Sequence, residues 1–167
     1  MSMIQNFLRV NLETLNSFLT DSHSLRKMVY SNEAIHLDNL IDIDKAWEGI
    51  FFLLTGESIG TYDQAALPLS WLLVGPNDID RNQDMGYGPA TYTDIEQTRQ
   101  IDLALKEISI DELTQRFDPA TMLEKDIYPD IWEEENALDY LLQYFEDLKA
   151  FYQMAALHHE AVILFLN

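Results

Sequence analysis

Two carboxylates stand close together at Asp42 and Asp44, where they alternate with Ile41 and Ile43. Alternation of apolar and polar residues predicts a strand, and residues two apart in a strand share a face. A pair of carboxylates on one face can bind a hard cation or divide the roles of acid and base. Two ligands are too few for a metal site, so the other interpretation has Asp42 facing solvent and Asp44 capping the next helix.

The segment Gly56-Glu57-Ser58-Ile59-Gly60 matches the Gly-x-Ser-x-Gly pattern around a hydrolase nucleophile. That serine needs a strand before it and a helix after it, whereas here a helical apolar pattern ends at Gly56. We therefore interpret Gly56 as a helix C-cap and the match as accidental. No catalytic residue is predicted.

The sequence His158-His159-Glu160 offers three consecutive potential zinc ligands. Adjacent side chains point in different directions, and no spacing of three or four residues brings these ligands onto one face. We predict instead the end of a helix, where partly cationic histidine interacts favourably with the helix dipole. Neither a metal nor another cofactor is predicted.

Four aromatic residues lie in segments that glycine and proline interrupt: Tyr87, Tyr92, Tyr128 and Trp132. Such backbone is typical of loops, and tyrosine and tryptophan combine a large apolar surface with a polar tip suited to a ligand. They either pack as core beneath the loops or line a binding site. We predict that they converge on one cleft, with Trp47 supporting them and Asp44 at its edge.

The elements that must position these residues follow from periodicity. Residues 3–10 and 161–166 read as strands that share a sheet, and residues 47–54 as a helix with one buried side. Thr93 with Glu96, and Ser109 with Glu112, match the capping-box pattern at helix starts. The fold class expected is α+β: a small sheet including both terminal strands, packed against several helices in one domain over residues 1–167.

The longest predicted helix covers residues 133–158, with three glutamates at its start. One apolar stripe faces the core, and a second strip holds Tyr140, Tyr144 and Phe151. Either the helix is covered on two sides or this strip meets a partner; burial on two sides is the commoner arrangement.

Charge is the most extreme property, with 29 acidic and 10 basic side chains and a net charge of -19. Binding to nucleic acid or to an anionic membrane requires clustered Lys and Arg, so we predict neither. The same field either favours encounters with basic proteins or serves solubility alone, which is the commoner role of such a charge. It also predicts that moderate salt raises the melting temperature by screening self-repulsion.

The compartment follows from what the sequence lacks. There is no cysteine, which excludes disulfides and thiolate chemistry. The first residues have neither a basic segment nor a continuous apolar segment typical of a secretory signal. We therefore expect a cytoplasmic protein.

Several segments carry a family resemblance: residues 40–47 with 53–56, 86–90, 127–129 with Trp132, and 151–162. In order and spacing they resemble the YfbM-like family of bacterial proteins of unknown function (the DUF1877 type) over nearly the whole chain. The resemblance implies a compact α+β domain. It implies no catalytic residues, because no activity is attached to the family.

Two hypotheses about function therefore remain. The first is a non-catalytic binding protein, of the inhibitor or immunity type, whose acidic surface docks on a basic protein. The second is a small enzyme that uses carboxylates and tyrosines in a loop-lined cleft to act on a small molecule. The oligomeric state is not predicted. In either case Asp42, Asp44, Trp47, Tyr87, Tyr92, Tyr128 and Trp132 are the candidate binding residues.

Overall fold

A five-stranded antiparallel sheet forms the centre of the structure, a computed structural model that describes residues 2–31 and 37–167. Its strands are β1 (Gln5–Val10), β2 (Leu40–Asp42), β3 (Asn77–Asp78), β4 (Thr91–Thr93) and β5 (Ala161–Leu166), in the order β2-β1-β5-β4-β3. The terminal strands β1 and β5 pair along their whole length, from Gln5 opposite Leu166 to Val10 opposite Ala161. Both predicted terminal strands and their shared sheet are therefore confirmed.

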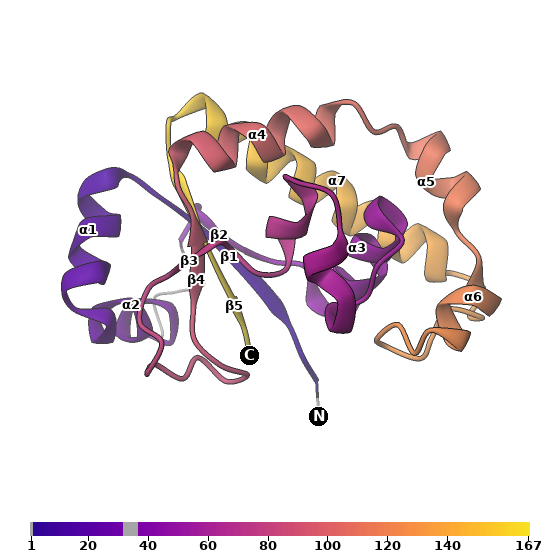
Figure 1. The fold of residues 1–167 in the computed structure, drawn as a ribbon, viewed down its shortest axis with the longest axis horizontal. Helices are drawn as coiled ribbons and strands as arrows, with labels where there is room; N and C mark the ends of the chain where they lie inside the picture. The colour runs from indigo at the N-terminus through magenta and orange to yellow at the C-terminus, as the bar shows by residue number, and fades with distance from the viewer. Residues whose placement is uncertain (1, 32–36) are drawn as a thin grey trace.

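Helices cover both faces of the sheet (Figure 1). On one face lie α1 (Leu12–Thr20) and α2 (Ser22–Val29), which pack against Leu8 and Ile163. On the other lie α3 (Trp47–Thr55), α4 (Ile95–Lys106), α5 (Ile110–Arg116), α6 (Pro119–Glu124) and α7 (Ala137–Leu157). Alternate residues of β1 and β5 supply the two cores, as the two-residue period of a strand requires. The α+β class is confirmed.

Three short 3-10 helices connect these elements: η2 (Asp44–Ala46), η3 (Ile59–Gln64) and η4 (Leu69–Leu72). The first joins β2 to α3 directly. It therefore places Asp44 between the edge of the sheet and the start of α3.

Of the two capping boxes predicted at helix starts, one is confirmed and one is shifted by a residue. Ser109 and Glu112 form the predicted capping box of α5. At α4 the prediction was wrong by one residue, because Asp94 and Gln97 form the box. Thr93 instead belongs to β4, where it is buried and its hydroxyl lies 2.9 Å from that of Thr98.

Two predicted helices also need correction. α7 begins at Ala137, so Glu133 to Glu135 precede the helix and do not lie in its first turn. α3 is buried on all sides and not on one, since every residue from Trp47 to Leu54 is buried. A helix that is covered all round cannot show a strong amphipathic pattern.

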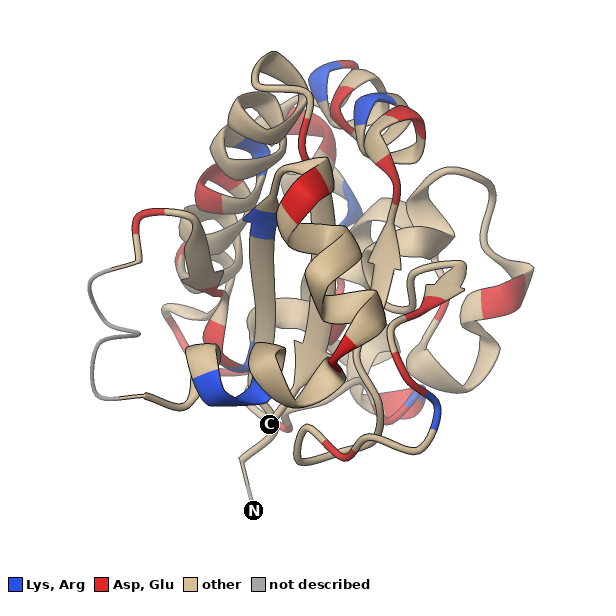
Figure 2. Cartoon of the chain, turned by 90° about the vertical axis from the view of Figure 1, so that its left-hand side faces the viewer, with Lys and Arg blue, Asp and Glu red and all other residues tan. Residues whose placement is uncertain are grey.

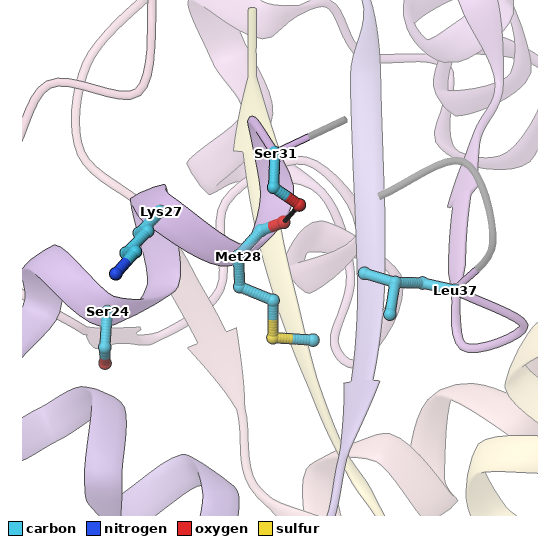
Figure 3. A pocket seen from close by; sticks show the side chains of 5 residues that line it. All are labelled: Ser24, Lys27, Met28, Ser31 and Leu37. Carbon is cyan, nitrogen blue, oxygen red and sulfur yellow. Dashed lines mark hydrogen bonds between the residues drawn. The ribbon is translucent and has the colours of Figure 1, made fainter. Parts of the chain in front are cut away.

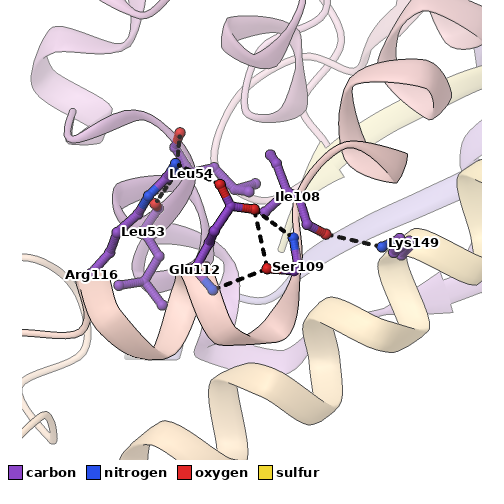
Figure 4. A network of polar contacts seen from close by, with 7 residues as sticks. All are labelled: Leu53, Leu54, Ile108, Ser109, Glu112, Arg116 and Lys149. Carbon is purple, nitrogen blue, oxygen red and sulfur yellow. Dashed lines mark hydrogen bonds and ion pairs between the residues drawn. The ribbon is translucent and has the colours of Figure 1, made fainter.

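Two long basic side chains connect the segment around α5 with the C-terminus of α3 and with the middle of α7 (Figure 4). Arg116 of α5 donates to the carbonyl oxygens of Leu53 at 3.1 Å and Leu54 at 3.4 Å, which satisfies carbonyls at the C-terminus of α3. Lys149 of α7 donates to the Ile108 carbonyl at 3.1 Å. Both contacts tie the segment around α5 to the rest of the fold.

Candidate functional site

The first turn of α3 holds the loop of residues 127–132, which carries two of the predicted aromatics. Trp47 is buried and stacks on Tyr128, with ring centroids 5.7 Å apart and planes inclined by 30°. Its indole nitrogen donates to the Met3 carbonyl at 3.0 Å, and the Tyr128 hydroxyl accepts from the Met3 amide at 3.0 Å. Trp47 and Tyr128 are thus brought together, as predicted, and they are anchored to the N-terminal segment.

Glu48, the next residue of α3, is a buried carboxylate that the sequence did not indicate. It is 2% exposed, and it accepts hydrogen bonds from the backbone amides of Ile59 at 2.7 Å and Tyr128 at 2.9 Å. A buried carboxylate is tolerated where such donors surround it. Glu48 therefore joins η3 and the loop of residues 127–132 to α3 and serves a structural purpose.

Gly49 completes this turn by making room for Trp132. A β-carbon at Gly49 would lie 2.5 Å from the Trp132 ring, so the two elements approach more closely than a side chain allows. Trp132 itself is 1% exposed, and its indole nitrogen donates to the Ile127 carbonyl at 2.7 Å. Trp132 is thus core beneath the loop, and it does not present a binding group to solvent.

Asp44 lies beside α7 and does not cap α3, which corrects the predicted helix cap. β2 ends at Asp42, whose carboxylate accepts from the Asp44 amide at 3.1 Å, and Asp44 adopts a left-handed backbone with φ 46°. This turn directs the Asp44 carboxylate to the Tyr140 hydroxyl, which donates to it at 3.0 Å. The same hydroxyl accepts from the Lys45 amide at 3.1 Å.

The two tyrosines of α7 are half-buried beside these carboxylates. Their rings meet edge to face with centroids 5.2 Å apart. Burial and then the hydrogen bond to Asp44 raise the pKa of Tyr140 far above its usual value. Burial also raises the pKa of Tyr144, and the nearby charges of Asp44, Asp42 and Asp147 raise it further. Both phenols are therefore neutral hydrogen-bonding groups at physiological pH.

We call these five residues the tyrosine face: Asp42, Asp44, Tyr140, Tyr144 and Asp147. It runs along the solvent-facing side of α7 next to β2, the edge strand of the sheet. Tyr140 and Tyr144 belong to the second strip that the sequence singled out, whereas Phe151 of that strip is 6% exposed. Their spacing of four residues was the signal for this surface, because residues four apart lie on one side of a helix.

A cavity of about 330 Å³ opens at one end of the tyrosine face. Its polar lining comes from Asp44, Lys45, Glu134, Asn136 and Tyr140, and its apolar lining from Pro129, Ile131 and Ala137. The loop that α3 holds in place thus forms one wall, and α7 with η2 forms the other. The arrangement suits recognition of a group with a cationic end and an apolar stem.

None of the four loop aromatics lines the cavity at Asp44, so the expectation that they converge on one cleft is wrong. Tyr128 lines a separate hollow with Asp126 and Asp130, and Trp132 is core. Tyr92 belongs to β4 and packs on the opposite face of the sheet from Trp132. Tyr87 is 40% exposed and lies in a turn, where its backbone amide donates to the Leu166 carbonyl at 3.0 Å. The three-residue strand β4 was not recognisable from the sequence, because glycine and proline precede it. Its pairing in the sheet directs the Tyr92 side chain to the face opposite Trp132.

The other sequence motifs have structural explanations. Gly56 caps α3 with φ 79°, as predicted, and Ser58 caps η3. His159 adopts φ 53° at the turn into β5, and Glu160 pairs with Arg9 at 2.8 Å. Among the residues described, no three His, Asp or Glu side chains form a group that could hold a metal ion. No helix in the described ranges is long and apolar enough to cross a membrane.

A separate hollow of about 310 Å³ lies beside α2 (Figure 3). Met28 and Leu37 provide its apolar lining, and Lys27 lies at its edge. Its walls include Ser31 and Leu37, between which the chain is not described. It contains none of the predicted site residues.

Acidic residues occur on several helices and loops in the view of Figure 2, whereas basic residues are fewer and scattered. Several basic residues are already paired: Arg81 with Asp78, Arg99 with Glu96, and Lys106 with Asp102, each at 2.6 Å. The net negative field is therefore not confined to the tyrosine face. What distinguishes that face is the combination of carboxylates with half-buried aromatic surface.

Comparison with known proteins gives a family and a fold. The family model described as "Domain of unknown function (DUF1877)" matches residues 1–165. The chain is similar in structure to the crystal structure of YfbM from Escherichia coli, a protein of unknown function. The TM-score is 0.72, with 21% sequence identity over 98% of this chain and 99% of that one. No curated protein matches the sequence.

Proposed function

The chain belongs to the DUF1877 family of unknown function, and from its own surface we propose that it is a non-catalytic binding protein that docks a basic protein. The observation that carries this proposal is the tyrosine face. Three carboxylates there surround two neighbouring, half-buried tyrosines. We propose the bacterial cytoplasm as the place where this occurs, in keeping with a chain that has no cysteine.

The composition of the tyrosine face matches what protein interfaces use. Tyrosine is enriched among the residues that dominate binding energy, because it buries a large surface and keeps a hydrogen-bonding tip. The surrounding carboxylates complement Lys and Arg of a partner, and a net charge of -19 accelerates their encounter. Affinity and rate of association would then both fall with added salt.

The protonation states favour binding over chemistry. With its pKa raised by burial and by Asp44, Tyr140 stays protonated, so it donates a hydrogen bond and does not act as a base. That hydroxyl already bridges Asp44 and the Lys45 amide. The enzyme hypothesis needs a base that is free to move a proton in this cavity, whereas the hydrogen bonds of Asp44 and Tyr140 hold these two groups in one arrangement.

The test is affinity capture from bacterial lysate at low and at high salt, using the wild-type chain and an Asp42→Asn/Asp44→Asn variant. We expect a basic protein that is retained at low salt, is lost at high salt, and binds the variant at least about tenfold more weakly after purification. The matched control is Glu107→Gln/Glu124→Gln, which removes the same charge at exposed positions of other elements. It should retain nearly full affinity.

The proposal fails if the two double variants lose affinity equally, since the charge would then act without a defined site. It also fails if no protein is retained but native mass spectrometry finds a small molecule bound to the chain. That second result would support the enzyme hypothesis.

A further inference from the structure

A second hollow, of about 300 Å³, lies at the other end of the tyrosine face, between β2 and α7. Its apolar lining comes from Ile41, Ala150, Phe151 and Met154. Its acidic lining comes from Asp38, Asp42 and Asp147. Met154 is 40% exposed, so apolar surface is available to a partner at this place.

The one basic side chain in this lining is already neutralised. Arg9 pairs with Glu160 at 2.8 Å, and its guanidinium lies 5.6 Å from the centre of the Phe151 ring. The side chains of Arg9 and Glu160 are 12% and 17% exposed, so the pair is largely shielded from solvent. The three aspartates therefore give the hollow a negative charge that no lining residue cancels.

The side of α7 between the two cavities has the spacing of a helix-pairing surface. Tyr140, Tyr144, Asp147 and Met154 are at least partly exposed on this side, and the nearly buried Phe151 completes a row with alternating intervals of four and three residues. This is the interval at which residues form the seam between two packed helices. The structure places the first cavity at the start of this row and the second at its end.

We propose that this row is the docking seam for a basic helix of the partner, with one Lys or Arg side chain entering each cavity. The inference rests on the proposed function and adds the form of the partner. Tyr140 and Phe151, which line different cavities, are eleven residues apart, or about 16 Å along α7. A helix lying alongside brings two residues eleven apart to the same side at the same separation, because eleven residues complete three turns.

Each cation would sit as long basic side chains generally do. Its methylene groups contact the apolar lining, Ile41 and Met154 in the second hollow, while its charged end reaches the carboxylates at the rim. Tyr144 and its neighbours on the seam meet the apolar stripe of the partner helix between the two cations.

The probe is a synthetic helical peptide with two arginines eleven residues apart and apolar residues between them on the same side. The control peptide has the same composition with its arginines seven residues apart, which keeps them on one side but shortens their separation. On the full chain we expect NMR shift changes at the methyl groups of Ile41, Ala150 and Met154. The first peptide should bind about fivefold more tightly than the second.

Two neighbouring variants locate the effect. Asp147→Asn should weaken binding of the first peptide by about fivefold, whereas Glu146→Gln removes the same charge one residue away, off the seam, and should change it little. Equal binding of the two peptides, or equal effects of the two variants, would overturn the helix proposal. If the captured partner depends on Asp42 and Asp44 but not on Asp147, this inference fails while the proposed function stands; dependence on none of them defeats both.

Discussion

At the scale of the residue, two tyrosines of α7 show opposite uses of a phenol. The Tyr140 hydroxyl has a donor and an acceptor contact on the tyrosine face. The Tyr152 ring packs against Phe7 and Phe151, and its buried hydroxyl has no hydrogen-bond partner among the described residues. Burial raises the pKa of Tyr152, so the group stays neutral, but its desolvation is not compensated.

These environments predict opposite effects of the same substitution. Tyr152→Phe should increase the free energy of unfolding by about 1 kcal/mol, because it removes an unpaired polar group without leaving a cavity. Tyr140→Phe should decrease it by about 1 kcal/mol, since Asp44 and the Lys45 amide each lose a partner. Urea unfolding of both variants checks the pair, and a loss of stability in Tyr152→Phe would show that its hydroxyl is paired in solution.

At the scale of the element, one turn of α3 organises the loop that forms a wall of the first cavity. Trp47 stacks on Tyr128, Glu48 accepts from its amide, and Gly49 admits Trp132. Three consecutive residues of a helix point in three directions. Because α3 is covered on all sides, each of the three can contact a different part of the loop.

Gly49→Ala tests this arrangement directly. The added β-carbon would lie 2.5 Å from the Trp132 ring and 2.8 Å from a Leu141 methyl group. We expect a loss of roughly 2–3 kcal/mol in unfolding free energy, because overpacking outweighs the better helix propensity of alanine. Gly60→Ala is the control, since its β-carbon would meet its nearest neighbour at 3.6 Å. Tryptophan fluorescence and thermal unfolding would report the difference, and equal stability of the two variants would contradict it.

At the scale of the whole molecule, the dominant property is charge. Carboxylates outnumber basic groups 29 to 10, and the pairs that form are mostly short-range ones on the surface. Such surface pairs contribute little to stability. The carboxylates in excess of the basic groups repel one another across the fold. The same repulsion that opposes folding would be relieved when a basic partner binds.

Moderate NaCl should therefore raise the melting temperature by several degrees relative to low salt, because screening weakens this repulsion. Differential scanning calorimetry across a salt series measures the effect. The Glu107→Gln/Glu124→Gln variant should melt at a higher temperature in low salt and respond less to added NaCl. A melting temperature that falls steadily with NaCl would mean that the ion pairs present outweigh the repulsion.

Sequence alone determined the features that depend on neighbours along the chain. Ser109 and Glu112 form their capping box because each contacts an amide within three residues, and the branched run 161–166 forms the predicted strand. The family could likewise be anticipated from the order and spacing of its motifs, whereas cores on both sides of the sheet were not anticipated.

Only the tertiary structure decided the candidate site, because its contacts join residues far apart in the chain. Asp44 and Tyr140 are separated by 96 positions, and Glu48 and the Tyr128 amide by 80. Local patterns assigned Asp44 to a cap and did not indicate Glu48, because no residue near them in the sequence shows what packs against them. Trp132 lies in the core and Tyr92 on the opposite face of the sheet for the same reason. The direction of a side chain depends on the segment to which it belongs. Both β4 and the loop of residues 127–132 are short enough for tertiary packing to override their local sequence signals.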